Sequence, residues 1–328
     1  MVECATNRSR LLAAAAMAAS LLALASCASA PTSGDAFAFG VMGDTPYNER
    51  EEPHFLEMIE RMNAEPLAFV IHVGDFKAGS HAPCTDELFA RRKAQFDLSA
   101  HPLIYTPGDN EWTDCRRPTN GAMDPVERLA KLREVFFSGA SSLGRERMDT
   151  TFQAKCAERD GGACPCPAQP ENRAWMRSGV RFVTVNFPGP DDDVGHGAAT
   201  DAEARCRDAA NRQWLERAVK ESAGADTRGL VVATQADPWV NKVFQPFLRE
   251  LAAAAQRLGK PVLFVHGDTH IYRFDTPFVD ESGQALANPS RLETYGSPFV
   301  GWEKVTVDPD NPDLFRVESK LQALVPPR

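Results

Sequence analysis

A repeated strand ending constrains this chain more than any other feature of its sequence. Continuous apolar segments that alternate with amphipathic helices, such as residues 54–62 and 202–222, predict an α/β fold with buried sheets. Ligands in such folds bind at the carboxyl ends of the strands, where a glycine lets the chain turn sharply. Four apolar segments end in this way, at residues 37–42, 67–73, 102–105 and 262–266, and the Gly-Asp pairs that follow them carry Asp44, Asp75, Asp109 and Asp268. The sequence therefore predicts four carboxylates in one crevice.

Four carboxylates at neighbouring strand ends indicate a metal site. Carboxylates held close together repel one another unless protons or cations intervene. His270 lies two residues beyond Asp268 and would add a nitrogen ligand on the same side of an extended segment. The alternative is that each aspartate only caps the next helix, because Gly-Asp is also a common turn sequence.

Composition narrows the class of protein. The chain has 328 residues, of which 43% are hydrophobic and 25% charged, as expected for a globular protein. The length allows one large α/β domain or two small ones, and because open α/β sheets run past about 250 residues without dividing, we expect a single domain over residues 36–320. The formal net charge is -9, and no basic run offers a surface for a phosphate backbone, so we expect no nucleic-acid partner.

The N-terminus differs from the rest of the chain. Arg8 and Arg10 precede an apolar run over residues 11–25, the order found in secretory signals. The run is shorter than the roughly 20 residues of a membrane-spanning helix, which is the alternative. It ends in Leu-Ala-Ser-Cys and resembles the lipobox of bacterial lipoproteins, with Cys27 as the lipidated residue. We expect a signal peptide over residues 1–26, a tether over residues 27–35, and a periplasm-facing envelope protein anchored to the membrane by a lipid.

Cysteine usage agrees with export. Without Cys4 in the signal and Cys27 at the lipid, an even number of cysteines remains, and an oxidising compartment favours disulfides between them. A zinc site is the rival interpretation, although the Cys-Pro-Cys sequence lacks the spacing of a zinc knuckle. We expect Cys84 to pair with Cys115, because each follows a strand-ending motif. The disulfide candidates are Cys84, Cys115, Cys156, Cys164, Cys166 and Cys206.

The order of these motifs resembles the calcineurin-like metallophosphoesterases. That family carries Asp-X-His, Gly-Asp, Gly-Asn-His-Asp/Glu, a separate His and Gly-His-X-His, and the match extends over most of residues 37–308. Gln235 stands where the family has the separate His. The resemblance implies a four-layer α/β/β/α sandwich of two mixed sheets. Past Thr269 the pattern changes to short strands, which we expect to form an antiparallel second sheet.

Several positions depart from the family pattern. Pro46 replaces the His of the first motif, and Asp109 and Asn110 replace the Asn and His of the third. Asp268 replaces the first His of the last motif. Oxygen has thus replaced nitrogen at most ligand positions, which favours Mn or Mg, with Ca as a further oxygen-preferring ion, over Zn.

Carried over residue by residue, the resemblance implies a site for two metal ions bridged by one aspartate. The ligands are Asp44, Asp75 and His270 for one ion, and Asp75, Asp109, Asp268 and Gln235 for the other. The implied activity is hydrolysis of a small-molecule or envelope phosphate ester by a metal-activated water, with Asp75, His270 and Asn110 as catalytic residues.

Two features argue for a weaker catalyst. Four carboxylates cancel the charge of two divalent ions, which lessens the attraction for phosphate. Asn110 cannot act as a general acid, a loss of roughly 10²- to 10⁴-fold in rate. The alternative function is a catalytically impaired relative that binds an envelope component without turning it over. An unrelated serine hydrolase is not supported, because the chain has no Gly-X-Ser-X-Gly elbow.

Overall fold

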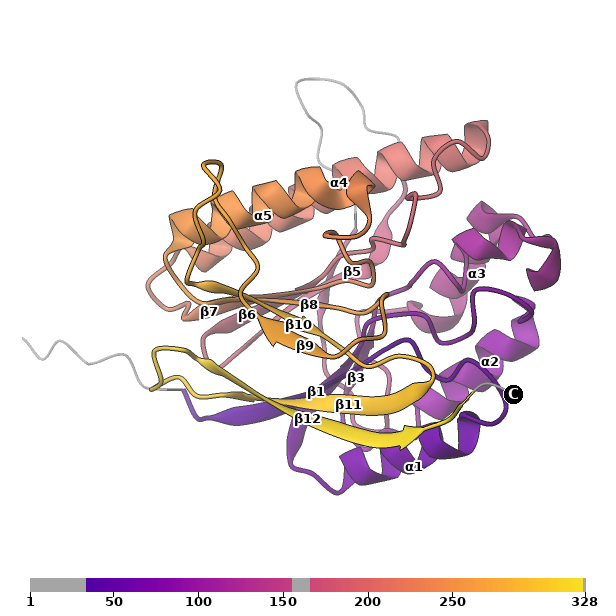
Figure 1. The fold of residues 1–328 in the computed structure, drawn as a ribbon, viewed down its shortest axis with the longest axis horizontal. Helices are drawn as coiled ribbons and strands as arrows, with labels where there is room; N and C mark the ends of the chain where they lie inside the picture. The colour runs from indigo at the N-terminus through magenta and orange to yellow at the C-terminus, as the bar shows by residue number, and fades with distance from the viewer. Residues whose placement is uncertain (1–33, 155–165, 327–328) are drawn as a thin grey trace, which may run out of the picture. The chain divides into compact units, whose positions relative to one another are not determined.

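The computed structural model describes residues 34–154 and 166–326, which contain two β-sheets and five α-helices (Figure 1). In chain order the elements are β1 (Phe37–Met42), α1 (Glu52–Asn63), β2 (Leu67–His72), α2 (Asp86–Phe96), β3 (Leu103–Tyr105), the 3₁₀ helices η1 (Thr113–Arg116) and η2 (Pro118–Asn120), α3 (Pro125–Phe136), β4 (Thr151–Gln153), β5 (Gln169–Arg177), β6 (Val180–Thr184), α4 (Ala198–Ser222), β7 (Gly229–Ala233), η3 (Lys242–Phe244), α5 (Gln245–Leu258), β8 (Val262–His266), β9 (Arg273–Asp275), β10 (Pro289–Glu293), β11 (Phe299–Val307) and β12 (Phe315–Leu324).

Both sheets are mixed. The first has the strand order β12-β11-β1-β2-β3, in which β1, β2 and β3 are parallel and β11 and β12 run antiparallel to their neighbours. The second has the order β4-β5-β6-β7-β8-β10-β9, with a parallel centre from β6 to β10 and antiparallel edges. The parallel strands are buried on both faces, as their continuous apolar sequences predict.

Three apolar cores define four layers. Phe39 and Phe69 of the first sheet pack against Phe182 of the second, with ring centroids 5.3 and 5.0 Å from Phe182, in the core between the sheets. A second core lies between the first sheet and helices α1, α2 and α3. A third lies between the second sheet and helices α4 and α5 (Figure 1). The predicted α/β/β/α sandwich is therefore confirmed.

The expectation of an antiparallel second sheet built from the C-terminal strands is wrong. These strands divide between the sheets: β9 and β10 extend the second, where β10 is parallel to β8, and β11 and β12 extend the first beside β1. Alternation of apolar residues identifies a strand but not its neighbour, because pairing is decided by packing against distant segments.

From Gly34 onward the chain forms one compact unit. The expected signal peptide, Cys27, Cys156 and Cys164 lie outside the described residues. Among the helices of the described ranges, none has the length and apolar character needed to cross a bilayer.

Candidate metal centre

The four Gly-Asp loops and the loops after β6, β7 and β10 meet at the carboxyl ends of both sheets. Backbone bonds hold them together: Asp44 N–H donates to Gly74 O at 2.9 Å, and Ser297 N–H donates to Asp44 O at 2.9 Å. Asp44, Asp75 and His270 have left-handed φ angles of 51°, 55° and 65°. Such conformations are rare for residues with a side chain and cluster at functional sites.

Glycine is required where these loops approach most closely. A Cβ on Gly108 would lie 2.8 Å from Cγ of Asp75 and 2.7 Å from Cγ of Gln235. A Cβ on Gly267 would lie 3.0 Å from Cγ of Asp44. The glycines of the third and fourth Gly-Asp pairs thus make room for carboxylates that belong to the other loops.

Asp75 lies at the centre of the crevice and is buried. Its Oδ1 accepts the backbone N–H of Asn110 at 3.1 Å, and its Oδ2 accepts Nε2 of Gln235 at 3.0 Å. Gln235 comes from the second sheet, and its Oε1 accepts the N–H of Gly189 at 3.2 Å. With its nitrogen on a carboxylate and its oxygen on an N–H, Gln235 acts in this arrangement as a hydrogen-bond donor to Asp75.

Asp44 forms a second link between the sheets. Its two carboxylate oxygens lie 3.1 and 3.2 Å from the backbone N of Asp268, which donates to them. Nε2 of His270 lies 3.6 Å from Oδ1 of Asp44. The Oδ2 atom of Asp268 itself accepts the N–H of Asp237 at 2.9 Å and Nδ2 of Asn241.

Tyr47 follows Pro46, the residue that stands where the resemblance placed a histidine. Its hydroxyl donates to Oδ2 of Asp75 at 3.3 Å, lies 3.1 Å from Nε2 of His270, and accepts Nδ2 of Asn110 at 3.0 Å. His270 in turn donates Nδ1–H to Ser297 O at 2.6 Å, which leaves its Nε2 lone pair facing the crevice. The position of Tyr47, three residues beyond Asp44, is the sequence signal that its side chain could reach the crevice.

The crevice concentrates negative charge. Burial raises the pKa values of the Asp44, Asp75 and Asp109 carboxyls well above their usual range, and repulsion from neighbouring carboxylates raises them further. Asp109 and Asp75 repel each other, as do Asp109 and Asp268. Burial also raises the pKa of Asp268. The predicted carboxylates are therefore close enough to interact, as the strand endings indicated.

Two further ionisable groups, Glu111 and Lys77, hydrogen-bond to the backbone of the crevice loops. Glu111 accepts the N–H of Asp75 at 3.0 Å and of Gly108 at 2.8 Å, and burial raises its pKa. Nζ of Lys77 donates to the backbone oxygens of Asn110 and Ala78 at 2.5 and 2.8 Å. Burial lowers the pKa of Lys77 to about 8. Several buried carboxylates therefore face one ammonium group. Carboxylate oxygens and one imidazole are ligand types that an oxygen-preferring divalent cation takes, although in the described residues no three of these crevice side chains bring ligand atoms within 4.8 Å of one another.

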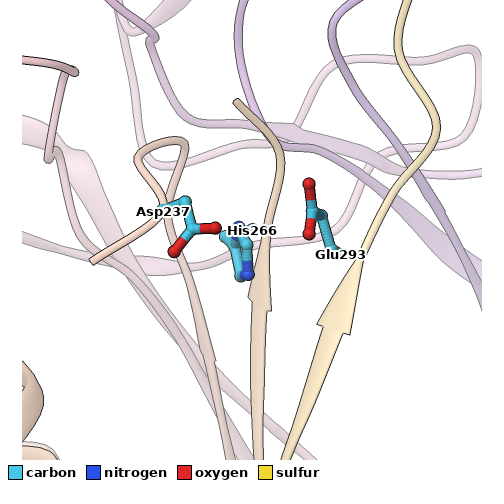
Figure 2. A group of neighbouring side chains, drawn as sticks. All are labelled: Asp237, His266 and Glu293. Atoms are coloured by element: carbon cyan, nitrogen blue, oxygen red, sulfur yellow. The ribbon is translucent and has the colours of Figure 1, made fainter. Parts of the chain in front are cut away.

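A tighter group of three side chains lies beside the crevice. His266 and Glu293 are the last residues of β8 and β10, and Asp237 lies in the loop after β7. Their ligand atoms all lie within 4.8 Å of one another. Figure 2 shows His266 between the two carboxylates. Sequence reasoning missed these residues, because His266 was taken as the last residue of a strand, and the other two follow no motif.

Two disulfides occur in the described residues. Cys84 pairs with Cys115, as the sequence predicted, and thereby joins the segment before α2 to η1 beside the third Gly-Asp loop. Cys166 pairs with Cys206 of α4. Disulfides of this kind indicate that the protein folds in an oxidising compartment.

Arg116 links a loop of the first sheet to a loop of the second sheet through charged and polar contacts. It lies in η1, which follows β3 of the first sheet. Its Nη1 pairs at 2.8 Å with Oδ1 of Asp193, in the loop after β6 of the second sheet. Its Nη2 contacts Nε2 of His196 at 2.8 Å. The neighbouring Asp192 pairs with Arg207 of α4, which is fully buried. The loop that reaches the crevice at Gly189 is therefore fixed by charge pairs on both sides.

Among known proteins, the chain is similar to solved structures. No protein-family model matches the chain, and no curated protein matches it in sequence. The chain is similar to a structure described as GAP50, the anchor in the inner membrane complex of Plasmodium, with 8% identity over 88% of this chain and 89% of that one and a TM-score of 0.49. It is also similar to a dimetal phosphatase from Danio rerio, with 12% identity over 88% of this chain and 99% of that one and a TM-score of 0.47. The chemistry of the crevice therefore rests on its own side chains.

Proposed function

We propose that this protein is a metal-dependent phosphoesterase of the cell envelope. One observation carries the proposal: Asp75 lies at the centre of a buried, negatively charged crevice and is hydrogen-bonded from both sheets, by Asn110 and Gln235. A buried cluster of this kind is stabilised by divalent cations. The motif order that resembles the calcineurin-like metallophosphoesterases supports phosphate esters as the substrate class.

The proposed ligands are the residues expected from the sequence, with one change of role. Asp44, Asp75, Asp109, Asp268 and His270 hold one or two Mn or Mg ions. Gln235 is assigned instead to orienting Asp75, since its nitrogen donates to that carboxylate and its oxygen is bound to Gly189. Divalent cations bound there supply Lewis acidity toward phosphoryl oxygens and toward water.

The side chains around the cations have separate tasks in this proposal. Tyr47 fixes the positions of Asp75 and His270 through its hydroxyl group. Nδ2 of Asn110, now bonded to that hydroxyl, is the donor assigned to the leaving oxygen of the ester. Lys77 offsets part of the carboxylate charge from below.

A specific observation favours the second function, a binding protein that does not turn its ligand over. The amide groups of Gln235 and Asn110 donate to Asp75 and Tyr47, and one oxygen of Asp268 accepts two hydrogen bonds from the segment after β7. A crevice with its polar groups satisfied internally holds its shape without an ion. In this alternative the fold presents a rigid acidic surface to an envelope component.

The test is metal content together with turnover. The mature protein and its Asp75→Asn variant are loaded with Mn, analysed by mass spectrometry and assayed with a chromogenic phosphate monoester and a diester, with and without chelator. Asp208→Asn is the matched control, because its side chain is 43% exposed on α4 and its ion pair is with Arg212 of the same helix. We expect chelator-sensitive turnover in the wild type and the control, and a loss of at least about 10²-fold in Asp75→Asn. Undiminished turnover in Asp75→Asn would refute the site. Bound metal without turnover on either ester would favour the binding protein.

The envelope location is part of the same proposal. It is supported by the lipobox-like sequence that ends at Cys27 and by the two disulfides. Mass spectrometry of the protein from membranes is expected to find a diacylglyceryl group on Cys27, and Cys27→Ser is expected to release the protein from the membrane fraction. Release of unmodified wild-type protein would contradict a lipid anchor.

A further inference from the structure

Asp237, His266 and Glu293 lie close together beside three neighbouring strands of the second sheet. His266 and Glu293 end β8 and β10, and Asp237 follows β7. Glu293 is opposite His266 in the parallel pairing of β10 with β8. His266 faces the same side of the sheet as Phe264, two residues earlier, which packs in the core below α5. Figure 2 shows the imidazole between the two carboxylates, and all three residues have an exposed fraction of 0%. This group lies on the helix side of the sheet.

Two polar atoms of the group are buried without a hydrogen-bond partner in the described part of the chain. They are Nε2 of His266 and Oδ2 of Asp237. Nδ1 of His266 contacts Gly267 O at 2.8 Å, and a carbonyl oxygen accepts only from a protonated nitrogen, so in the neutral ring the lone pair is on Nε2. Buried lone-pair atoms that accept no hydrogen bond are destabilising.

We propose that Asp237, His266 and Glu293 form a second cation site, separate from the carboxylate crevice, for a divalent transition metal such as Zn²⁺. Zinc binds imidazole nitrogen and carboxylate oxygen at about 2.0–2.2 Å in a tetrahedral arrangement, so two ligands on one ion lie about 3.3–3.6 Å apart. The three ligand atoms lie within 4.8 Å of one another, so side-chain movements of about 1 Å bring them to this spacing. The bond from Nδ1 to a backbone carbonyl is the arrangement that orients a histidine ligand.

The guanidinium group of Arg273 lies where it would compete with a metal ion for Glu293 and Asp237. Its Nη1 lies 2.7 Å from Oε2 of Glu293 and 3.8 Å from Oδ2 of Asp237, and its side chain is 33% exposed. Oε1 of Glu293 is held independently by the hydroxyl of Thr269 and by Ile271 N–H at 3.4 Å. The carboxylate therefore stays in position when the guanidinium moves into solvent, and a metal ion takes over its charge.

The proposed cation site is connected to the carboxylate crevice by hydrogen bonds. Asp237 donates its N–H to Asp268, and Gly267, which accepts from His266, begins the fourth Gly-Asp loop. An ion bound to Asp237 and His266 therefore fixes the loop that carries Asp268. The role is structural, and it does not depend on turnover in the crevice.

The test counts zinc on variants that separate the two sites. Wild type, His266→Gln, Asp75→Asn and the double variant are dialysed against Zn²⁺ and analysed by mass spectrometry, with circular dichroism to verify folding. We expect His266→Gln to lose one equivalent of zinc that Asp75→Asn retains. Equal zinc content in folded wild type and His266→Gln would overturn the proposal, whatever the outcome for phosphoesterase activity.

Arg273→Gln tests the site without removing a ligand. Loss of the competing charge is expected to lower the zinc dissociation constant about tenfold or more. Co²⁺ provides a local readout, because the ring centroids of Trp239 and His266 are 5.9 Å apart and a bound paramagnetic ion quenches nearby indole fluorescence. Quenching is expected in the wild type, stronger at low Co²⁺ in Arg273→Gln, and reduced in Trp239→Phe. Unchanged affinity in Arg273→Gln would refute the site.

Discussion

Replacing Glu303 with Gln tests the cost of a buried acid in the first sheet. Glu303 lies in β11 and is fully buried. Its Oε1 accepts the N–H of Tyr295 at 3.3 Å, whereas its Oε2 has no hydrogen-bond partner in the described residues. Burial raises the pKa of this carboxyl from 4.5 to about 8. Gln has nearly the same shape as the protonated acid and carries no titrating group.

The size of the effect follows from the pKa shift. Because the folded protein holds this proton more tightly than the unfolded chain, the stabilisation is complete below pH 4.5 and is lost as the pH rises toward about 8. The slope between these values is about 1.4 kcal/mol per pH unit. Glu303 alone should therefore lower the free energy of unfolding by about 3 kcal/mol between about pH 5 and pH 7.5.

Urea denaturation of the wild type and Glu303→Gln at about pH 5 and about pH 7.5 measures this difference. The stability of Glu303→Gln relative to the wild type should rise by about 3 kcal/mol over the interval. Glu318→Gln in β12 is the control, because its side chain is 38% exposed, and its effect should stay within about 0.5 kcal/mol at both pH values. Parallel pH profiles for Glu303→Gln and wild type would refute the reasoning.

Two further predictions concern the disulfide and the tyrosine of the crevice. Replacing both Cys84 and Cys115, which are 31 residues apart, with Ser should lower the free energy of unfolding by about 3–4 kcal/mol in chemical denaturation; a loss under about 1 kcal/mol would contradict a loop constraint. Tyr47→Phe keeps the ring and removes the hydroxyl between Asp75 and His270, so steady-state kinetics on the folded variant should show about tenfold lower kcat. Equal kcat values would show that the hydroxyl does not position either residue.

The sequence predicts those parts of the fold that are encoded locally. Strands β1 and β8 begin and end at the predicted residues, because each is a continuous apolar run that stops at a turn sequence. The four-layer arrangement followed from a family resemblance, and the three cores confirm it. The placement of β10, β11 and β12 could not be derived, because their partners are distant in sequence and pairing depends on packing.

The site shows the same division. Asp44 and Asp75 were predicted because each follows a glycine at a strand end, and His270 because it lies two residues beyond Asp268. The structure brings the three together. The donor role of Gln235 was not predictable, since it depends on the N–H of Gly189 in another loop. Asp237 and Glu293 gave no signal, because an isolated acidic residue after a strand is common on protein surfaces.

The strand order of the first sheet has a consequence for biosynthesis. β1 pairs with β11, so that Phe37 lies opposite Val307, and β12 then covers β11. Until residues 299–324 have emerged from the ribosome, β1 has an open edge and the first sheet lacks two of its strands. Contacts of such high sequence separation form slowly. The first sheet therefore cannot be completed before β11 and β12 have been synthesised, and the loops of the crevice that depend on it are fixed only after these strands have docked.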